Sequence, residues 1–322
     1  VYTPLHGTGG RPMKRILSDF GYNFEVVKEQ IEPDGNFPTV TYANPEEKAA
    51  FKLGVKLADE IGAKIVMAND PDADRIGIAV KDDKNEWYYP NGNQVGLLLL
   101  QYLLNNKKDI PANAKVITTV VSTPMIDVVA PSKNVGVMKT LTGFKYIGEI
   151  IAGLREDGVE SKYFFGYEES NGFLVSPFIC DKDGVSTALL IACMAAQYKA
   201  EGIDLFERLN QINTVYGRLI ERIENFVFEG IEGEKQIARI MDYFRMNELS
   251  EIANFDERID FLKDETGMPK ADVLLMRTES KSTFIVRPSG TEPKIKLYMY
   301  LEPKDLKIAR KFERLINSFT VY

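Results

Sequence analysis

The chain has 322 residues, of which 44% are hydrophobic and 27% charged, and its formal net charge at pH 7 is −7. This length allows two or three domains, and the composition is ordinary for a globular protein. The acidic balance argues against a nucleic-acid surface or an anionic-membrane surface. With only two cysteines, we expect no disulfide framework and a cytoplasmic location. We find no signal peptide and no apolar run long enough to cross a bilayer, so no membrane partner is expected.

The first part of the chain alternates strand and helix signals. Asn44 and Pro45 are typical of a helix start, and Gly62 of a helix end. This β-α-β order predicts an α/β domain over residues 1–93 with a mostly parallel sheet. The elements expected there are strands over 1–5, 24–27, 65–68 and 76–80 and helices over 13–20 and 44–61.

A second, similar α/β domain is expected over residues 94–217, so that the chain holds two similar α/β modules with mixed sheets, and a smaller α+β domain is expected over 218–322. In the second domain we expect helices over 95–104, 124–130, 147–154 and 185–199 and strands over 115–121, 135–137 and 163–166. In the third we expect strands over 218–223, 272–277, 283–287 and 294–300 and helices over 234–246 and 306–319.

Three aspartates at alternate positions are the most informative feature. Asp70, Asp72 and Asp74 lie between two apolar runs that read as buried strands. They therefore crowd onto a tight connection, where their charges repel unless a cation joins them. Carboxylate oxygens suit Mg²⁺ or Ca²⁺ rather than zinc, and Arg75 adds a permanent cation that can hold a phosphate. The alternative is a solvated turn, because aspartate is common in turns.

A loop between two of the later strands has the composition of a phosphate site. Arg287 supplies a forked cation, Ser289 and Thr291 supply hydroxyls, and Gly290 allows close approach of the backbone. Such a loop can cradle a phosphate through its N–H groups. The alternative is an ordinary hairpin turn that contains proline and glycine.

Three further positions are candidates for chemistry. Glu168 and Ser170 follow a buried strand, where they can bond sugar hydroxyls, although an acidic surface turn is the simpler interpretation. Lys145 lies near a helix start, which suits an anion, and its alternative is a solvated lysine. His6, the only histidine, lies in a Gly-rich turn, and a role as acid or base needs partners that the sequence does not reveal.

Taken in this order, these loops resemble those of the α-D-phosphohexomutase family, the phosphoglucomutases and phosphomannomutases. The resemblance covers nearly the whole chain. The Gly-Tyr-Glu-Glu-Ser-Asn-Gly-Phe and Asp-Lys-Asp-Gly-Val stretches are most similar to the long bacterial phosphoglucomutases and their phosphopentomutase relatives. The motifs that carry the resemblance are Leu-His-Gly-Thr-Gly, Asp-x-Asp-x-Asp-Arg, Thr-Gly-Phe-Lys, Glu-Glu-Ser and Arg-Pro-Ser-Gly-Thr-Glu-Pro.

The resemblance implies a fold and a set of roles. Family members have three similar α/β domains and a smaller α+β domain around a deep cleft. The aspartate loop is expected to bind Mg²⁺, with Arg75 beside the reacting phosphate and Lys145 as an active-site cation. Glu168 and Ser170 are expected to contact sugar hydroxyls. The phosphate that is not transferred is expected to be held by Arg287, Ser289, Gly290 and Thr291.

One family feature is missing from the sequence. A phosphorylated serine in the first domain of the family donates and recovers the phosphoryl group, within a Ser-His-Asn-Pro type loop, and this chain has no such loop. We therefore expect the chain to correspond to domains two to four, and to be inactive alone. Some sugar loops of the family end in His where this one has Asn171-Gly172-Phe173, which leaves the choice between glucose and mannose open.

The function implied is Mg²⁺-dependent interconversion of glucose 1-phosphate and glucose 6-phosphate, with glucose 1,6-bisphosphate as the intermediate. Phosphoryl transfer of this kind depends on positioning and charge neutralisation. The alternatives are a phosphopentomutase of the same fold and a silent sugar-phosphate or Ca²⁺-binding module. A phosphatase that uses Asp70 as nucleophile is a further alternative. The sequence leaves the oligomeric state open.

Overall fold

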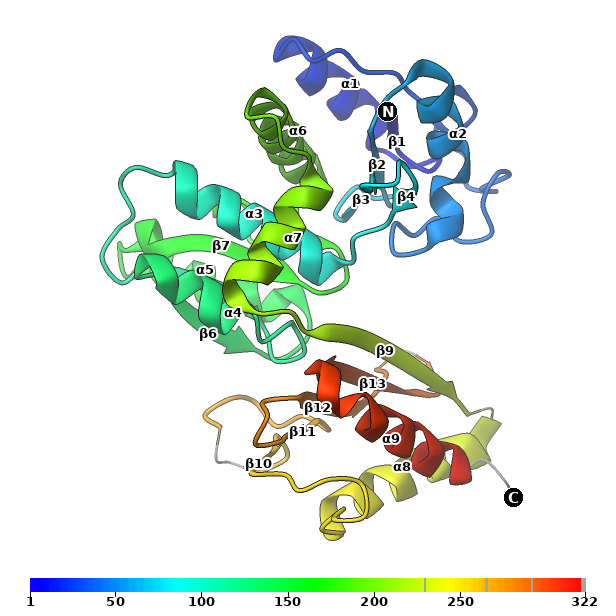
Figure 1. Cartoon of the computed structure of the whole chain (residues 1–322), viewed down its shortest axis with the longest axis vertical. Helices are drawn as coiled ribbons and strands as arrows, with labels where there is room; N and C mark the ends of the chain where they lie inside the picture. Colours follow the sequence, from blue (N-terminus) through cyan, green and yellow to red (C-terminus); the bar gives the residue numbers. More distant parts are fainter. Residues whose placement is uncertain (229, 264–265, 291, 320–322) are drawn as a thin grey trace. The chain divides into compact units, whose positions relative to one another are not determined.

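The computed structural model describes residues 1–228, 230–263, 266–290 and 292–319 (Figure 1). The chain divides into two compact units, Val1–Gly217 and Arg218–Tyr322. Among the described residues, the first unit holds two four-stranded sheets and the second a five-stranded sheet. The expected fold class, α/β followed by α+β, is confirmed. The boundaries of the three expected domains stay predictions.

The first sheet has the strand order β1-β2-β3-β4. Its strands are β1 (Tyr2–Thr3), β2 (Ile65–Asn69), β3 (Ile76–Lys81) and β4 (Trp87–Tyr88). Only the β1–β2 pair is parallel, whereas β2–β3 and β3–β4 are antiparallel. The prediction of a mostly parallel sheet is therefore wrong here. The reason is the short aspartate connection, since parallel neighbours need a long crossover and a tight turn joins only antiparallel strands.

Two other expectations in this region need correction. The expected strand over 24–27 is reduced to one isolated bridge between Tyr2 and Val26. The expected helix start at Asn44 is a turn, in which the Asn44 side chain accepts a hydrogen bond from Glu46 N at 2.9 Å. The helices of this region, including two 3-10 turns, are α1 (Gly10–Asp19), η1 (Lys28–Gln30), η2 (Lys48–Phe51) and α2 (Lys52–Ile61).

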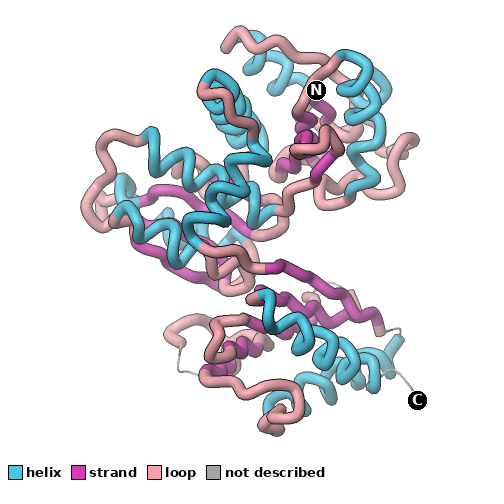
Figure 2. The backbone as a smooth tube through the Cα atoms, viewed as in Figure 1, coloured by secondary structure: helices cyan, strands magenta, loops and turns pink. Residues whose placement is uncertain are grey.

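The second sheet has the order β6-β5-β7-β8, with parallel β5–β6 and β5–β7 pairs and an antiparallel β7–β8 pair. Figure 2 draws the strands in magenta and the helices around them in cyan. Its strands are β5 (Lys115–Thr119), β6 (Gly136–Thr140), β7 (Tyr163–Glu168) and β8 (Gly172–Leu174). The helices that precede or link them are α3 (Gly92–Asn106), α4 (Ile126–Val129), η3 (Ala130–Lys133), α5 (Phe144–Glu156) and η4 (Glu160–Lys162).

Helices α3 and α5 cover opposite faces of this sheet. A Cβ on Gly166 would meet Ile147 of α5 at 3.2 Å, whereas Gly96 of α3 lies directly against the Tyr167 ring. Neighbouring residues of a strand point to opposite faces, so the two helices must lie on opposite sides of β7. The result is a three-layer α/β/α arrangement with the sheet buried in the middle.

Two further helices complete the first unit, α6 (Gly184–Ala200) and α7 (Leu205–Tyr216). Asp183 caps α6 by accepting from Val185 N and Ser186 N. Helix α6 packs against β3 of the first sheet and β8 of the second, which ties the two sheets into one unit. Neither α7 nor β8 was expected from the sequence. Strand β8 is short and follows a tight loop, so its signal merges with that of β7.

The second unit is an antiparallel sheet with the order β10-β11-β12-β13-β9, covered on one face by two helices. The strands are β9 (Ile220–Val227), β10 (Glu257–Asp260), β11 (Leu274–Arg277), β12 (Thr283–Pro288) and β13 (Lys294–Leu301). The helices are α8 (Gly230–Met246) and α9 (Leu306–Ser318), the latter preceded by the 3-10 turn η5 (Pro303–Asp305).

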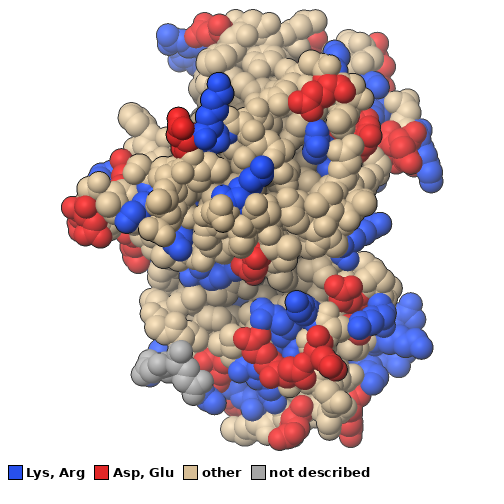
Figure 3. Space-filling view, turned by 60° about the vertical axis from the view of Figure 1, so that its left-hand side comes forward, with Lys and Arg blue, Asp and Glu red and all other residues tan. Residues whose placement is uncertain are grey.

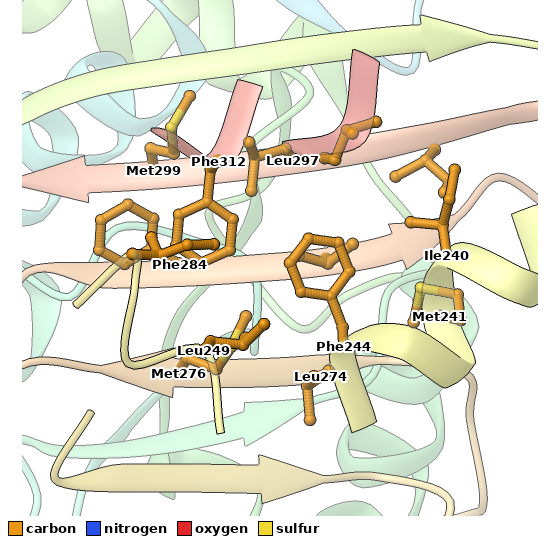
Figure 4. Packing of buried hydrophobic residues seen from close by; sticks show 14 of the residues in the cluster. Ile240, Met241, Phe244, Leu249, Leu274, Met276, Phe284, Leu297, Met299 and Phe312 are labelled. Atoms are coloured by element: carbon orange, nitrogen blue, oxygen red, sulfur yellow. The ribbon is translucent and has the colours of Figure 1, made fainter. Parts of the chain in front are cut away.

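The core of this unit lies between the helices and the sheet (Figure 4). The Phe312 ring of α9 stacks on Phe284 of β12 with centroids 4.6 Å apart, and Phe244 of α8 lies 5.6 Å from the same ring. All three rings are fully buried. These rings and the aliphatic side chains around them form one buried apolar cluster, and burial of such area stabilises the unit.

The surface carries a mixture of charges. On the face drawn in Figure 3, acidic and basic side chains are interspersed rather than gathered in single-sign areas. Among the described residues, no helix combines the length and the apolar character needed to span a membrane.

We expect Phe312→Ala to lower the free energy of unfolding of the second unit by about 3–5 kcal/mol, because it removes the central ring of a closely packed core. Urea denaturation measures this loss. Met246→Ala is the matched control, since Met246 lies at the end of α8 with 82% of its surface exposed, and it should change stability by less than about 0.5 kcal/mol. An equal loss in both variants would contradict this account of the core.

Candidate active site

The connection between β2 and β3 gathers the three aspartates. One carboxylate oxygen from each of Asp70, Asp72 and Asp74 lies within 4.8 Å of the others. The turn closes through Ala73, whose φ of 60° is left-handed and whose N–H donates to Asp70 O at 3.0 Å. Arg75 N also donates to Asp70 Oδ1 at 2.9 Å. The expected cluster therefore forms, because the tight turn points successive carboxylates toward one space.

The Gly-rich turn near the start of the chain packs against this connection. Thr8 N donates to Pro71 O at 2.7 Å, and a Cβ on Gly7 would lie 2.3 Å from Pro71 Cα. Only glycine allows this approach of two backbones. The motif that contains His6 thus contacts the aspartate loop through the backbone of Gly7 and Thr8.

The His6 side chain itself is buried in a structural contact. The ring is 4% exposed, its Nε2 lies 2.8 Å from Thr39 Oγ1, and its edge packs on Phe37. The His6 φ of 63° and the bonds of its backbone to Gln30 and Asp34 fix the turn. These contacts support the structural alternative for His6, and its catalytic role stays a prediction.

Two side-chain cations border the aspartates. Arg75 lies 3.6 Å from Asp70, 3.7 Å from Asp74 and 3.1 Å from Glu46. Lys182 Nζ lies 2.9 Å from Asp74 Oδ2. Asp74 Oδ1 is buried and, among the described residues, has no hydrogen-bond partner. A buried carboxylate oxygen that makes an ion pair with Arg75 but accepts no hydrogen bond, beside two other carboxylates, is a donor set that fits a divalent cation with oxygen ligands, such as Mg²⁺.

The crowding also changes the acidity of the site. Burial raises the pKa of Asp70 from 3.8 to about 7, and the charges of Asp74 and Asp72 act in the same direction, while the Arg75 N–H opposes them. Because the ionised form of Asp70 is destabilised here, a cation that joins the cluster would stabilise that form strongly.

Lys182 is a functional candidate that sequence reasoning missed. Its stem passes over Gly172, where an added Cβ would lie 2.4 Å from Lys182 Cδ. Burial lowers the pKa of Lys182, but the hydrogen bonds and charges of Asp74 and Asp181 together raise it overall, so the ammonium stays charged. The available signal was the Asp-Lys-Asp-Gly stretch at the start of α6, but nothing in the sequence indicated which loop the lysine would reach.

The loop between β7 and β8 lies against the aspartate loop. Ile76 N donates to Asn171 O at 3.1 Å, and Arg75 and Gly172 form an isolated bridge. These backbone contacts join residues about a hundred positions apart. The loop carries Glu168 and Ser170, so the structure brings both predicted sugar contacts to the neighbourhood of the aspartates.

Glu168, the last residue of β7, is buried, with 8% of its surface exposed, and Asn171 in the loop that follows is buried as well. Its Oε1 accepts from Gly143 N at 2.7 Å, at the start of α5, where Gly143 has a φ of 116°. Burial raises the pKa of Glu168, as does the charge of Glu169, whereas the Gly143 N–H, Lys182 and Arg75 lower it. Lys145 follows in the first turn of α5, exposed, with Nζ 4.8 Å from the Tyr146 ring centroid.

The predicted phosphate loop joins β12 to β13 in the second unit. Arg287 donates to the Tyr298 hydroxyl through Nη2 at 3.0 Å, and Arg287 lies directly opposite Lys296 in the strand register. Like charges opposite each other cost stability, and the Glu292 carboxylate of the same turn, which pairs with Lys294 at 2.5 Å and lies in the field of Lys296, offsets part of this cost. Ser289 N donates to Lys294 O at 2.8 Å. Gly290 lies in the same turn, and the predicted residue Thr291 lies outside the described residues.

Comparisons with known proteins identify the family of the chain. The family description "Phosphoglucomutase/phosphomannomutase, alpha/beta/alpha domain II" matches residues 1–84, and that of domain III matches residues 91–214. The chain is 39% identical over 315 residues to a phosphoglucomutase of Staphylococcus epidermidis, which covers 94% of this chain and 57% of that protein. The chain thus spans less than two thirds of the length of this relative.

Solved structures share the fold at low sequence identity. A phosphoglucomutase/phosphomannomutase family protein of Burkholderia thailandensis aligns with a TM-score of 0.73 at 17% identity, over 99% of this chain and 60% of that one. An N-acetylphosphoglucosamine mutase of Aspergillus fumigatus aligns with a TM-score of 0.59 at 14% identity, over 98% and 64%. With its fold, its aspartate cluster and these matches, the chain belongs to the phosphoglucomutase/phosphomannomutase family.

We expect Asp70→Asn to stabilise the chain in chelator at pH 8 by about 1–3 kcal/mol. Because folding raises the Asp70 pKa to about 7, the folded state binds more protons than the unfolded chain between about pH 4 and pH 7. The ionised Asp70 carboxylate therefore lowers the free energy of unfolding above pH 7. The increase in this free energy that Asp70→Asn brings should become smaller as the pH falls toward 4. Urea denaturation across this range measures the effect.

The control for this prediction is Asp83→Asn, since Asp83 is exposed in the β3–β4 turn. Its effect on the free energy of unfolding should be small at every pH. A loss of stability in Asp70→Asn at pH 8 in chelator would contradict the repulsion argued for the metal-free cluster.

Proposed function

We propose that this chain is the metal- and sugar-binding part of a phosphoglucomutase, which moves a phosphoryl group between positions 1 and 6 of glucose phosphate through a bisphosphate. The observation that carries the proposal is the contact between the aspartate loop and the Glu168 loop, through the bond from Ile76 N to Asn171 O and the bridge between Arg75 and Gly172. Lys182, whose stem passes over Gly172, adds an ion pair to Asp74. A metal site joined to a hydroxyl-binding loop is what phosphoryl transfer on a sugar requires.

The aspartates are assigned to the metal. Asp70, Asp72 and Asp74 would hold Mg²⁺ through one oxygen each, and the bound ion would supply charge neutralisation to phosphoryl oxygens. The mutase of Aspergillus fumigatus was solved in complex with GlcNAc-6P and magnesium. This supports Mg²⁺ as the ion rather than Ca²⁺.

The residues around the cluster are assigned to substrate. Arg75 and Lys182 place two positive charges beside the aspartates, where a phosphoryl group would need them. Glu168, held by Gly143 N, offers a buried carboxylate to sugar hydroxyls, together with Ser170 on the same loop. Lys145 lies on the first turn of α5, directly after this contact, and is the candidate for a further anion contact.

The hairpin of the second unit is assigned to the phosphate that is not transferred. Arg287 and Lys296 face each other across β12 and β13, and Ser289 and Gly290 follow in the turn. A phosphate bound there would be held by the forked guanidinium of Arg287. Thr291 stays part of this prediction from its position in the motif.

We expect the chain with Mg²⁺ to bind glucose 6-phosphate and glucose 1,6-bisphosphate but not to turn them over, because it supplies no phosphoserine loop. Calorimetry measures binding, and a coupled assay with glucose 1-phosphate and a trace of bisphosphate measures turnover, in this chain and in a longer protein that restores the phosphoserine segment. Turnover only in the longer protein supports the proposal.

Other outcomes of that experiment decide among the alternatives. Preference for ribose 5-phosphate over glucose 6-phosphate would favour the phosphopentomutase. Binding without turnover in both proteins would favour the silent module. Turnover by the present chain alone would contradict the proposed need for phosphoserine.

We expect Lys182→Met and Asp74→Asn to change Mg²⁺ affinity in opposite directions. Lys182 occupies an oxygen of Asp74 and repels a second cation, so its loss should tighten Mg²⁺ binding about threefold, while glucose 6-phosphate binding weakens about tenfold. Asp74→Asn removes a ligand and should weaken Mg²⁺ binding about tenfold or more. Calorimetry with each ligand tests both. Lys199→Met, exposed on α6, is the control and should change neither.

A further inference from the structure

Glu168 lies between two residues that are both bonded to the end of strand β5. Thr118 Oγ1 donates to Tyr167 O at 2.8 Å, on one side of Glu168, and Thr119 Oγ1 donates to Glu169 Oε2 at 3.1 Å, on the other. Consecutive threonines thus hold the residues before and after the proposed sugar contact. With both neighbours held, the direction of the Glu168 side chain is fixed toward Gly143 N.

The two threonines belong to a buried chain of hydroxyls. Ser122 Oγ lies 2.8 Å from Thr118 Oγ1 and 2.9 Å from Thr119 Oγ1, and the three residues are 0–3% exposed. The preceding strand positions, Val116 and Ile117, are apolar and fully buried. Burying hydroxyls costs free energy unless each is bonded, so their appearance only where β5 reaches the Glu168 loop indicates a role in that loop.

The backbone of the loop is held at the same place by close packing. A Cβ on Gly92, at the start of α3, would lie 2.1 Å from Glu169 O and 2.6 Å from Asn171 N. The two adjacent carboxylates bond to different elements. Glu168 accepts from Gly143 N at the start of α5, and Glu169 accepts from Thr119 at the end of β5. Since Asn171 O also accepts from Ile76 N, the loop has little freedom to turn without breaking one of these contacts.

We propose that Glu169, through its hydrogen bond to Thr119 and the hydroxyl chain behind it, is the positioning residue that aims Glu168 and Ser170 at the sugar. This inference rests on the proposed function, because it concerns how the same loop recognises sugar hydroxyls. Glu169 acts through its neighbours and does not contact the sugar itself. Positioning groups of this kind matter because small displacements of a binding side chain weaken its hydrogen bonds strongly.

The test compares three variants of one hydrogen bond in the full chain with Mg²⁺. Thr119→Val keeps the shape and removes the hydroxyl, Thr119→Ser keeps the hydroxyl, and Glu169→Leu removes the acceptor. We expect Thr119→Val and Glu169→Leu to weaken glucose 6-phosphate binding at least fivefold, and Thr119→Ser to restore it to within about twofold. Mg²⁺ affinity, measured by calorimetry with the metal alone, should stay unchanged, since the aspartates are untouched.

The matched control is Thr278→Val, a buried threonine in the second unit whose hydroxyl lies 2.8 Å from Ser280 Oγ. It should lower stability comparably and leave sugar-phosphate affinity unchanged. If Thr119→Val binds glucose 6-phosphate as the unaltered chain does, or loses Mg²⁺ and sugar affinity together, the positioning role is wrong. If the unaltered chain binds no sugar phosphate, the proposed function fails first, and this inference fails with it.

Discussion

Repulsion among three carboxylates on one tight turn is the constraint on which the rest of the first unit depends. Asp70, Asp72 and Asp74 place oxygens within 4.8 Å of one another, and burial makes the Asp70 anion costly. Two cations from separate parts of the chain offset this repulsion. Arg75 comes from the turn itself and Lys182 from the start of α6. Backbone contacts then join the aspartate loop to the Glu168 loop, through Ile76 N to Asn171 O and through the bridge between Arg75 and Gly172.

The same turn explains the departure from a parallel sheet. A connection of this length can join only antiparallel neighbours, so β3 runs back along β2 and carries Arg75 and Ile76 to the loop after β7. The bond from Ile76 N to Asn171 O then joins the first sheet to the second. In the second sheet the strands that bear the loops are parallel, so the carboxyl ends of β5 and β7 meet at one edge. Thr119 and Glu169 touch for that reason.

Much of this arrangement could be predicted from the sequence. The long helices α3, α5, α6, α8 and α9 and the strands β2, β3, β12 and β13 follow from apolar periodicity and from clear helix starts and ends. The expected strand over 24–27 and the helix start at Asn44 were wrong, because local propensity was outweighed by pairing and by a side-chain turn. Strands β8 and β10 and helix α7 were missed, because short or weakly periodic segments are stabilised by contacts made elsewhere in the fold.

The sequence by itself determined the chemistry of the candidate site. Alternating aspartates, a Glu-Glu-Ser loop and an Arg-Pro-Ser-Gly loop are local patterns, and their residue types limit the ligands that they can bind. Only the tertiary structure decided which residues act together. Lys182 reaches Asp74 across the space left by Gly172, and His6 turns inward to Thr39, whereas Glu169 turns to Thr119. Such partners are far apart along the chain, and their pairing depends on strand register and close packing rather than on local sequence.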